Sequence, residues 1–252
     1  NVEYMSSDMW VSYHDISKIF LPDTIRTIDR FHLLMEFSKK FNSIRCETMK
    51  KYALTKNAYQ KEKTKRKLKS DEEAIYREAC INYYAFKKFS WLFYKTDSDI
   101  LNPNNDKKFN RVFNRYMNFY DIHEHICSCD NGFEEICNLK YDLDMFFKNS
   151  TVETAKENLE NLIKDFKEND RDEMKNFAGT LSRWKNEIIY SFTIIGESTI
   201  NNGRIENINR TIKTIKRNAN GYKNFERLRR RIMWCVNKQG NIILSQRKEN
   251  ES

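Results

Sequence analysis

Residues 6–34 read SSDMWVSYHDISKIFLPDTIRTIDRFHLL, and this stretch decides the fold. Residues 2–6, which lead into it, alternate apolar and polar side chains as a half-buried strand does. Residues 24–28 form a second, β-branched run, and apolar side chains recur at helical spacing between the two runs. Asp8 follows the first run and Asp29 follows the second. The pattern therefore predicts a strand, a helix and a strand, with a carboxylate at the end of each strand.

Long helices are predicted for most of the remaining chain. The 252 residues include only 6 Gly and 2 Pro, and so few breakers favour helices over a many-stranded sandwich or barrel. A hydrophobic fraction of 39% and an aromatic fraction of 13% are sufficient for a buried core. Helical patterns cover residues 31–66, 70–94, 106–120, 133–148, 152–168 and 171–194, with a loop at 97–105.

A basic segment near the end of the chain carries the whole net charge of +9. Residues 203–238 contain 11 Lys or Arg and 2 Glu, which leaves 34 of the 45 basic and 34 of the 36 acidic residues elsewhere. The segment is predicted to form one helix with an isoleucine stripe, a break at Asn220-Gly221, and a second helix over 225–236. A focused basic patch suits a polyanion such as DNA, and the alternative is a solvated helix face.

Two motifs in this chain carry a family resemblance. The stretch 6–34 includes an Asp-x-x-His element, Asp29-Arg30-Phe31-His32. Residues 201–232 read NNGRIENINRTIKTIKRNANGYKNFERLRRRI. In this order the two motifs resemble the ISL-three family of insertion-sequence DDE transposases, although Asn207 stands where that family usually has Gly. The resemblance spans nearly the whole chain, but residues 35–180 match only in character.

The resemblance implies an α+β fold, mostly α-helical, in which a partial RNase H-like catalytic core is interrupted by an all-helical insertion domain. Residues 1–34 would form the second half of the core and residues 35–195 the insertion. Residues 196–238 would carry the catalytic glutamate helix and a basic C-terminal helix, followed by a tail at 239–252. The family's earlier strands, its first catalytic aspartate and its DNA-recognition regions are expected upstream of these residues.

Catalytic and metal-binding roles are implied for Asp8 and Glu206. Two divalent ions, Mg²⁺ or Mn²⁺, would serve DNA cleavage and strand transfer at insertion-sequence ends. Because the first catalytic aspartate is absent, the chain alone is expected to be inactive. The local alternatives are an N-cap role for Asp8 and an i,i+4 ion pair between Glu206 and Arg210.

Asp29 and His32 are three residues apart and could bind a metal. The favoured interpretation is that these residues do not bind the metal directly. They would support the metal ligands by hydrogen bonds or hold the insertion domain against the catalytic sheet. The family does not count this element among its three catalytic acids, which is the reason for that preference.

DNA binding is assigned to polar and basic residues that follow Glu206. These are Asn209, Arg210, Lys213, Lys216, Arg217, Lys223, Arg227, Arg229, Arg230 and Arg231. The expected partners are transposon-end and target DNA, with a homodimer or higher assembly on the DNA. No apolar run approaches the roughly 20 residues needed to cross a bilayer. The six cysteines are expected to be reduced, and the expected location is the bacterial cytoplasm, at the nucleoid during action.

Other features leave alternatives open. The segment KEKTKRKLK (61–69) could hold a DNA backbone or be a solvated helix end. The aromatic residues Tyr83, Tyr84, Trp91, Phe93 and Trp184 are assigned to the core rather than to base stacking. The segment HEHICSC, with His123, His125, Cys127 and Cys129, lies close to Cys137 but lacks the paired Cys-x-x-Cys spacing of ordinary zinc sites. The rival functions are a non-catalytic basic helical DNA-binding protein, including a decayed transposase remnant, and a zinc-stabilised helical protein.

Overall fold

The computed structural model describes residues 2–95, 99–195, 198–199 and 203–236. The chain divides into two compact units, residues 1–200 and residues 201–252, and each is described by itself. Most described residues are helical and the strands are few and short, so the expected α+β, mostly α-helical class is confirmed. Within this part of the chain, no helix is long and apolar enough to cross a membrane.

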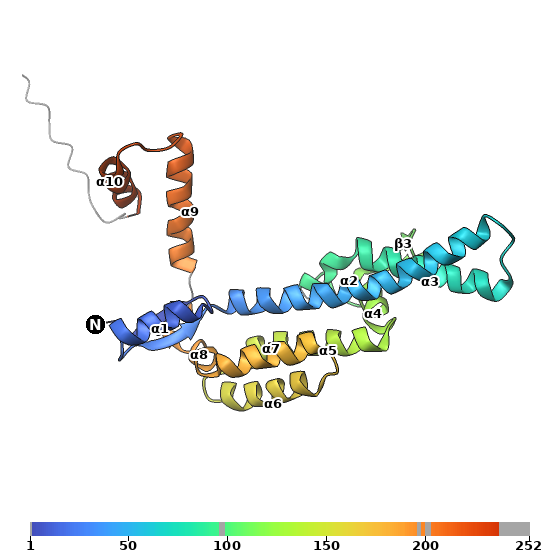
Figure 1. The fold of residues 1–252 in the computed structure, drawn as a ribbon, viewed down its shortest axis with the longest axis horizontal. Helices are drawn as coiled ribbons and strands as arrows, with labels where there is room; N and C mark the ends of the chain where they lie inside the picture. Colours follow the sequence, from blue (N-terminus) through green and yellow to red (C-terminus); the bar gives the residue numbers. More distant parts are fainter. Residues whose placement is uncertain (1, 96–98, 196–197, 200–202, 237–252) are drawn as a thin grey trace, which may run out of the picture. The chain divides into compact units, whose positions relative to one another are not determined.

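The first unit begins with the expected strand, helix and strand. Strand β1 (Tyr4–Ser7) pairs in parallel with β2 (Ile25–Ile28), and helix α1 (Val11–Phe20) connects them (Figure 1). The register sets Ser7 opposite Ile28. Parallel strands run in the same direction, so the residues that follow them emerge at the same edge.

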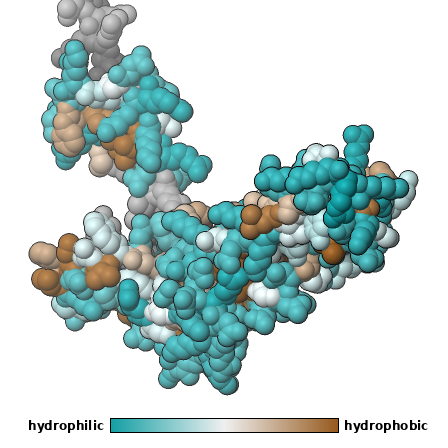
Figure 2. Space-filling view, turned by 45° about the vertical axis from the view of Figure 1, so that its right-hand side comes forward, coloured by the Kyte–Doolittle hydropathy of each residue, from teal (hydrophilic) through white to brown (hydrophobic). Residues whose placement is uncertain are grey.

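Apolar side chains remain exposed on helix α1. Trp10 is 57% exposed and Phe20 75%, and Ile16 and Ile19 are exposed as well. Figure 2 shows apolar residues gathered at this end of the first unit. The strand pair is itself only partly buried, because β1 is half-buried throughout and β2 is fully buried only at Thr27 and Ile28, whereas parallel strands in globular proteins are usually covered on both faces.

Helices form the rest of the first unit. The long helix α2 (Arg30–Lys63) forms an antiparallel hairpin with α3 (Ser70–Lys88), which continues into the short 3₁₀ helix η1 (Ser90–Tyr94). Four more helices that pack against this hairpin or one another are α4 (Phe119–Ser128), α5 (Asn131–Asn149), α6 (Ala155–Glu168) and α7 (Asp172–Arg183). Helix α8 (Lys185–Tyr190) and the pair β5 (Ile194–Ile195) and β6 (Ser198–Thr199) follow.

A phenylalanine-rich core fixes the first half of α2. Leu33, Phe37, Phe41 and Ile44 recur on one face of the helix and are at most 2% exposed. The Phe37 ring lies 5.2 Å from that of Phe177 on α7, within the range of favourable aromatic pairs. Because these residues begin one turn after the start of α2, core packing also fixes the position of that first turn.

The helix expected over residues 106–120 is wrong, and the segment expected to be all-helical therefore contains a hairpin. Strands β3 (Lys108–Asn110) and β4 (Arg115–Met117) pair antiparallel there. Asn114 has a φ of 52°, a left-handed conformation that asparagine tolerates and that ends a helix or forms a turn. Helix α4 begins only after the hairpin, capped by Asn118, whose side chain accepts a hydrogen bond from the Asp121 amide.

The helix expected over 171–194 is interrupted at Trp184. Trp184 has a ψ of 22°, outside regular helix geometry, and separates α7 from α8. Its ring is buried and meets the His14 ring edge to face at 5.2 Å. Tertiary packing of this tryptophan against α1 therefore accompanies the break, and its burial confirms a core role over base stacking.

The second unit contains helix α9 (Gly203–Asn218) and helix α10 (Phe225–Val236). Both were expected, as was the break between them. Asn220 and Gly221 have φ values of 50° and 98°, and the Gly221 amide donates to the Lys216 carbonyl, which closes the end of α9. Leu228 on α10 is buried, while the basic residues around it are exposed.

Candidate active site

Two carboxylates lie at the common edge of the parallel strands. Asp8 follows β1 and Asp29 follows β2, and the Asp29 amide donates to the Ser7 carbonyl, continuing the ladder by one residue. Asp29 is also the N-cap of α2, and its Oδ1 accepts a hydrogen bond from the Phe31 amide at 2.9 Å. This cap accounts for an acidic residue at the boundary between strand and helix.

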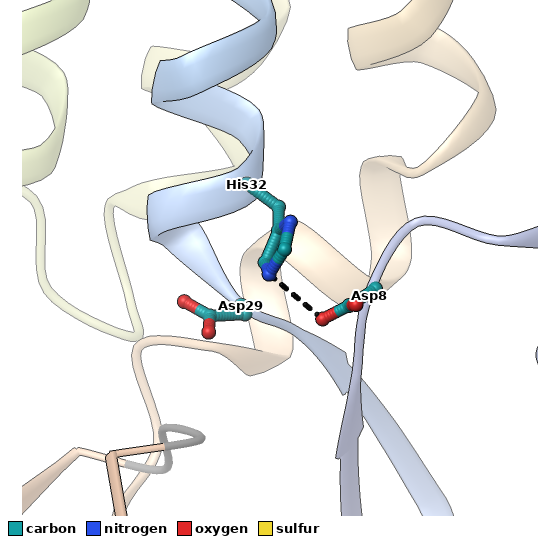
Figure 3. Close-up of side chains that lie close together, drawn as sticks. All are labelled: Asp8, Asp29 and His32. Carbon is teal, nitrogen blue, oxygen red and sulfur yellow. Dashed lines mark ion pairs between the residues drawn. The ribbon is translucent and has the colours of Figure 1, made fainter. Parts of the chain in front are cut away.

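His32 completes the group from the first turn of α2. Its Nε2 lies 2.9 Å from Asp8 Oδ1 (Figure 3). One donor atom from each of Asp8, Asp29 and His32 lies within 4.8 Å of the others, and this is the only such metal-compatible group in the described part of the chain. The side chains of Asp8 and His32 are 48% and 28% exposed, so an ion or a phosphate can approach them from solvent.

The donor set fits a divalent ion. Carboxylate oxygens are the ligands that Mg²⁺ and Mn²⁺ prefer, whereas imidazole suits softer metals. His32 is therefore better suited to orient the Asp8 carboxylate by a hydrogen bond than to bind Mg²⁺ itself. Trp10, and not Asp8, occupies the N-cap position of α1. The alternative prediction that Asp8 is the N-cap of this helix is therefore wrong.

Arg30 lies inside the Asp-x-x-His element. It connects this edge of the strand pair to Ser191 and Phe192, which lie close to the end of the first unit in the sequence. Its guanidinium donates to Ser191 Oγ at 3.1 Å and to the Ser191 carbonyl at 2.7 Å. It also lies over the Phe192 ring, 4.0 Å from its centroid. Burial lowers the pKa of Arg30 below its ordinary value. Arg30 was not among the site residues predicted from the sequence, and its place between Asp29 and His32 is the only sequence signal that marks it.

A second contact joins α1 to the same region. His14 Nε2 lies 3.5 Å from Glu187 Oε1 on α8. Residues 184–192 therefore pack against both α1 and the start of α2, although more than 150 positions separate them in the chain. Helix α9 follows this region after a short segment.

Glu206 belongs to the first turn of α9, but its side chain lies outside the described residues. Neither its expected approach to Asp8 nor the alternative pair with Arg210 is therefore tested. The ten predicted DNA-contact residues all lie in the second unit and are exposed. A cleft of about 630 Å³ between α9 and α10 is lined by Arg210, Tyr222 and Arg231 among others.

The histidines and cysteines of α4 do not converge on a metal. His123 and Cys127 share a face, with Cys127 Sγ 3.7 Å from His123 Nε2. His125 instead pairs with Asn82 at 2.9 Å, and Cys129 Sγ donates to the Ile126 carbonyl. These contacts fit side chains packed into a helical unit.

Comparison with protein families gives one match. A family model described as a transposase, that of the ISL-three DDE type, matches residues 1–232. The chain belongs to this transposase family. No curated protein and no solved structure matches it. Membership makes DNA the partner of this transposase, and DDE transposases use divalent metal ions.

Proposed function

We propose that this transposase chain contributes Asp8 and Glu206 to a metal-dependent site for DNA cleavage and strand transfer at insertion-sequence ends. The observation that carries the proposal is the position of Asp8 at the carboxyl edge of a parallel strand pair, beside Asp29 and His32. The strand pair would belong to an RNase H-like core, and the helices that follow it would form an insertion domain.

Each residue has a separate task in this proposal. Asp8 would hold a Mg²⁺ or Mn²⁺ ion from the strand edge, and Glu206 would hold a second ion from α9. His32 would keep the Asp8 carboxylate in one orientation, and Asp29 would fix the start of α2. Two such ions supply activation of the attacking oxygen and stabilisation of the leaving oxygen.

The basic residues of the second unit would position DNA for this chemistry. Exposed arginines and lysines bind phosphates without reading base sequence. Arg227, Arg229 and Arg230 follow one another closely on α10, on the side of the helix away from the buried Leu228. Arg231 lies one turn after Arg227, so the four arginines form one basic face. We propose that two or more copies assemble on the DNA, one at each transposon end.

A double-mutant cycle tests whether Asp8 and Glu206 serve one site. Mn²⁺ affinity would be measured for Asp8→Asn, Glu206→Gln and the double variant. Each single change is expected to remove most of the binding, and the double variant should lose little more, because residues that share a site are not additive. Additive losses would place the two carboxylates in separate sites and contradict the proposal.

Cleavage provides the second test. In a longer chain that also carries the family's first aspartate, Glu206→Gln is expected to abolish cutting of a transposon-end duplex and to leave DNA binding nearly unchanged. Unchanged cleavage in that variant would remove Glu206 from the site. DNA binding with no cleavage by the longer chain itself would favour the non-catalytic alternative.

A further inference from the structure

The hairpin of α2 and α3 extends beyond the core as an arm, defined here as residues 50–88, of which Ala85 and Phe86 still belong to the core. None of the α2 residues after Thr48, and none of the α3 residues before Ala79, is buried. Tyr52 is the last α2 residue that packs against the core, so the 11 residues from Ala53 to Lys63 carry the hairpin roughly 15 Å past it at 1.5 Å per residue. Figure 1 shows this end of the hairpin projecting beyond α4 and β3.

The arm carries an excess of positive charge. Residues 50–88 contain 12 Lys or Arg and 5 Asp or Glu. Two of the acidic residues at the tip are already paired, because Lys63 lies 3.2 Å from Glu73 and Arg66 lies 2.7 Å from Glu72. Seven lysines form no ion pair with any other described residue: Lys50, Lys56, Lys61, Lys67, Lys69, Lys87 and Lys88.

Tyrosines hold several of the arm's lysines in place. The Lys56 ammonium lies 4.5 Å from the centroid of the Tyr83 ring, and the Lys63 ammonium 5.0 Å from that of Tyr76. The two contacts connect α2 to α3 at positions seven residues apart on each helix. They therefore lie about 10 Å apart along the arm. Lys63 also donates to Glu73, whereas Lys56 forms no ion pair with a described residue and keeps its N–H donors available. A lysine held over a ring loses less side-chain entropy when it binds a partner.

We infer that the arm is a second DNA-contact surface, whose lysines hold the phosphate backbone of a duplex at a distance from the catalytic edge. Helix α2 begins at that edge and is about 50 Å long, which corresponds to roughly 15 base pairs of duplex. The two arginines of the arm are paired with glutamates, so unpaired lysines dominate its surface. Lysine acts as a point charge, which suits a phosphate backbone better than it suits bidentate recognition of carboxylates.

The surface of the arm is predominantly hydrophilic in Figure 2, unlike the apolar face of α1. Leu54 and Ile75 are its exposed large aliphatic side chains, and such scattered residues do not form a protein-docking patch. The inference uses DNA as the partner of a transposase, but it does not depend on the proposed roles of Asp8 and Glu206.

Matched charge removal tests the inference. The triple variant Lys61→Gln/Lys67→Gln/Lys69→Gln would be compared with Lys156→Gln/Lys167→Gln/Lys175→Gln, which removes the same charge from exposed positions on α6 and α7. Binding to a duplex of about 40 base pairs would be followed as salt is raised. The arm variant is expected to reduce the slope of log affinity against log salt by about 2 to 3, and the control by less than about 1. Equal changes in the two variants would overturn the inference.

Chemical protection supplies a test that needs no substitution. Amine acetylation of the wild-type chain, followed by mass spectrometry, should show that duplex DNA protects Lys61, Lys67 and Lys69 more than Lys156 and Lys175. Equal protection of both groups would contradict a DNA-binding arm, and equal protection of the arm by polyglutamate would contradict its assignment to DNA. Mn²⁺ affinity should be unchanged in the arm variant, which separates failure here from failure of the proposed catalytic site.

Discussion

His32 Nε2 lies 2.9 Å from Asp8 Oδ1, so the first turn of α2 is bonded to the carboxylate that follows β1. Asp29, the N-cap of the same helix, sets where that turn begins. The Asp-x-x-His element therefore connects a helix start to the end of the neighbouring strand. In the proposed site this contact restricts the orientation of one metal ligand.

The contact between His32 and Asp8 predicts a graded loss of metal binding. His32→Ala should weaken Mn²⁺ binding about 10- to 100-fold, the usual effect of removing a hydrogen-bond partner of a metal ligand. His32→Gln should recover much of the loss because its amide N–H can reach the same carboxylate oxygen. Titration calorimetry measures both variants. Equal losses in the two variants would show that the imidazole binds the metal directly or serves another purpose.

Asp29 allows its capping role to be separated from its charge. Asp29→Ala should lower the free energy of unfolding by about 1 kcal/mol, because the Phe31 amide loses its acceptor. Asp29→Asn should cost only a few tenths of a kcal/mol, since asparagine caps helices equally well. Urea denaturation provides the comparison. A large Mn²⁺-affinity loss in the stable Asp29→Asn variant would make Asp29 a metal ligand instead of a structural residue.

Arg30 should stabilise the first unit more than an exposed basic residue does. Arg30→Ala removes two hydrogen bonds to Ser191 and the contact with the Phe192 ring, and leaves a buried carbonyl without this donor. We expect a loss of about 3 kcal/mol in the free energy of unfolding. Lys39→Ala, on the exposed side of the same helix, should change it by less than about 0.5 kcal/mol. Similar small effects for both variants would show that the Arg30 contacts are unimportant for stability.

The basic face of α10 should make DNA binding sensitive to salt. Changing Arg229, Arg230 and Arg231 together to alanine should reduce the slope of log affinity against log salt by about 2 to 3. Fluorescence anisotropy with a duplex of arbitrary sequence gives this slope. An unchanged slope would place the main DNA surface outside α10, with the arm as the next surface to test.

Cys127 predicts a pH-dependent contribution to stability. A hydrogen bond with Cys137, assisted by His123 and opposed by burial, lowers the pKa of the Cys127 thiol from 9.0 to about 6. The folded state therefore favours the thiolate. This contribution is complete above the unfolded pKa near 9 and is lost as the pH falls through 6.

The difference in urea midpoint between wild type and Cys127→Ser should consequently increase from pH 6 to pH 9. Cys235→Ser, in the second unit, is the control and should show a difference that does not vary in this way. A pH-independent difference for Cys127→Ser would contradict a stabilised thiolate.

Local pattern was sufficient to predict several elements from the sequence. Strand propensity and the acidic residue after each strand predicted β1, β2 and their carboxylates, and scarce breakers predicted the long helices. Asn220 and Gly221 marked the end of α9 because left-handed backbone favours these residues. The prediction from local pattern was wrong for residues 106–120. There the left-handed backbone of Asn114 and the pairing of β3 with β4 form a hairpin in place of the expected helix.

Long-range contacts required the tertiary structure. The parallel register brings Asp8 and Asp29 to one edge, and the packed core of α2 then positions His32 against Asp8. Ser191 meets Arg30 across 161 positions of sequence, and no local periodicity encodes such a contact. By itself the sequence determined which residues could cap, bind metal or carry charge, because those are properties of single side chains and their near neighbours. The tertiary structure decided which of these residues meet, because non-local packing sets the distances between them.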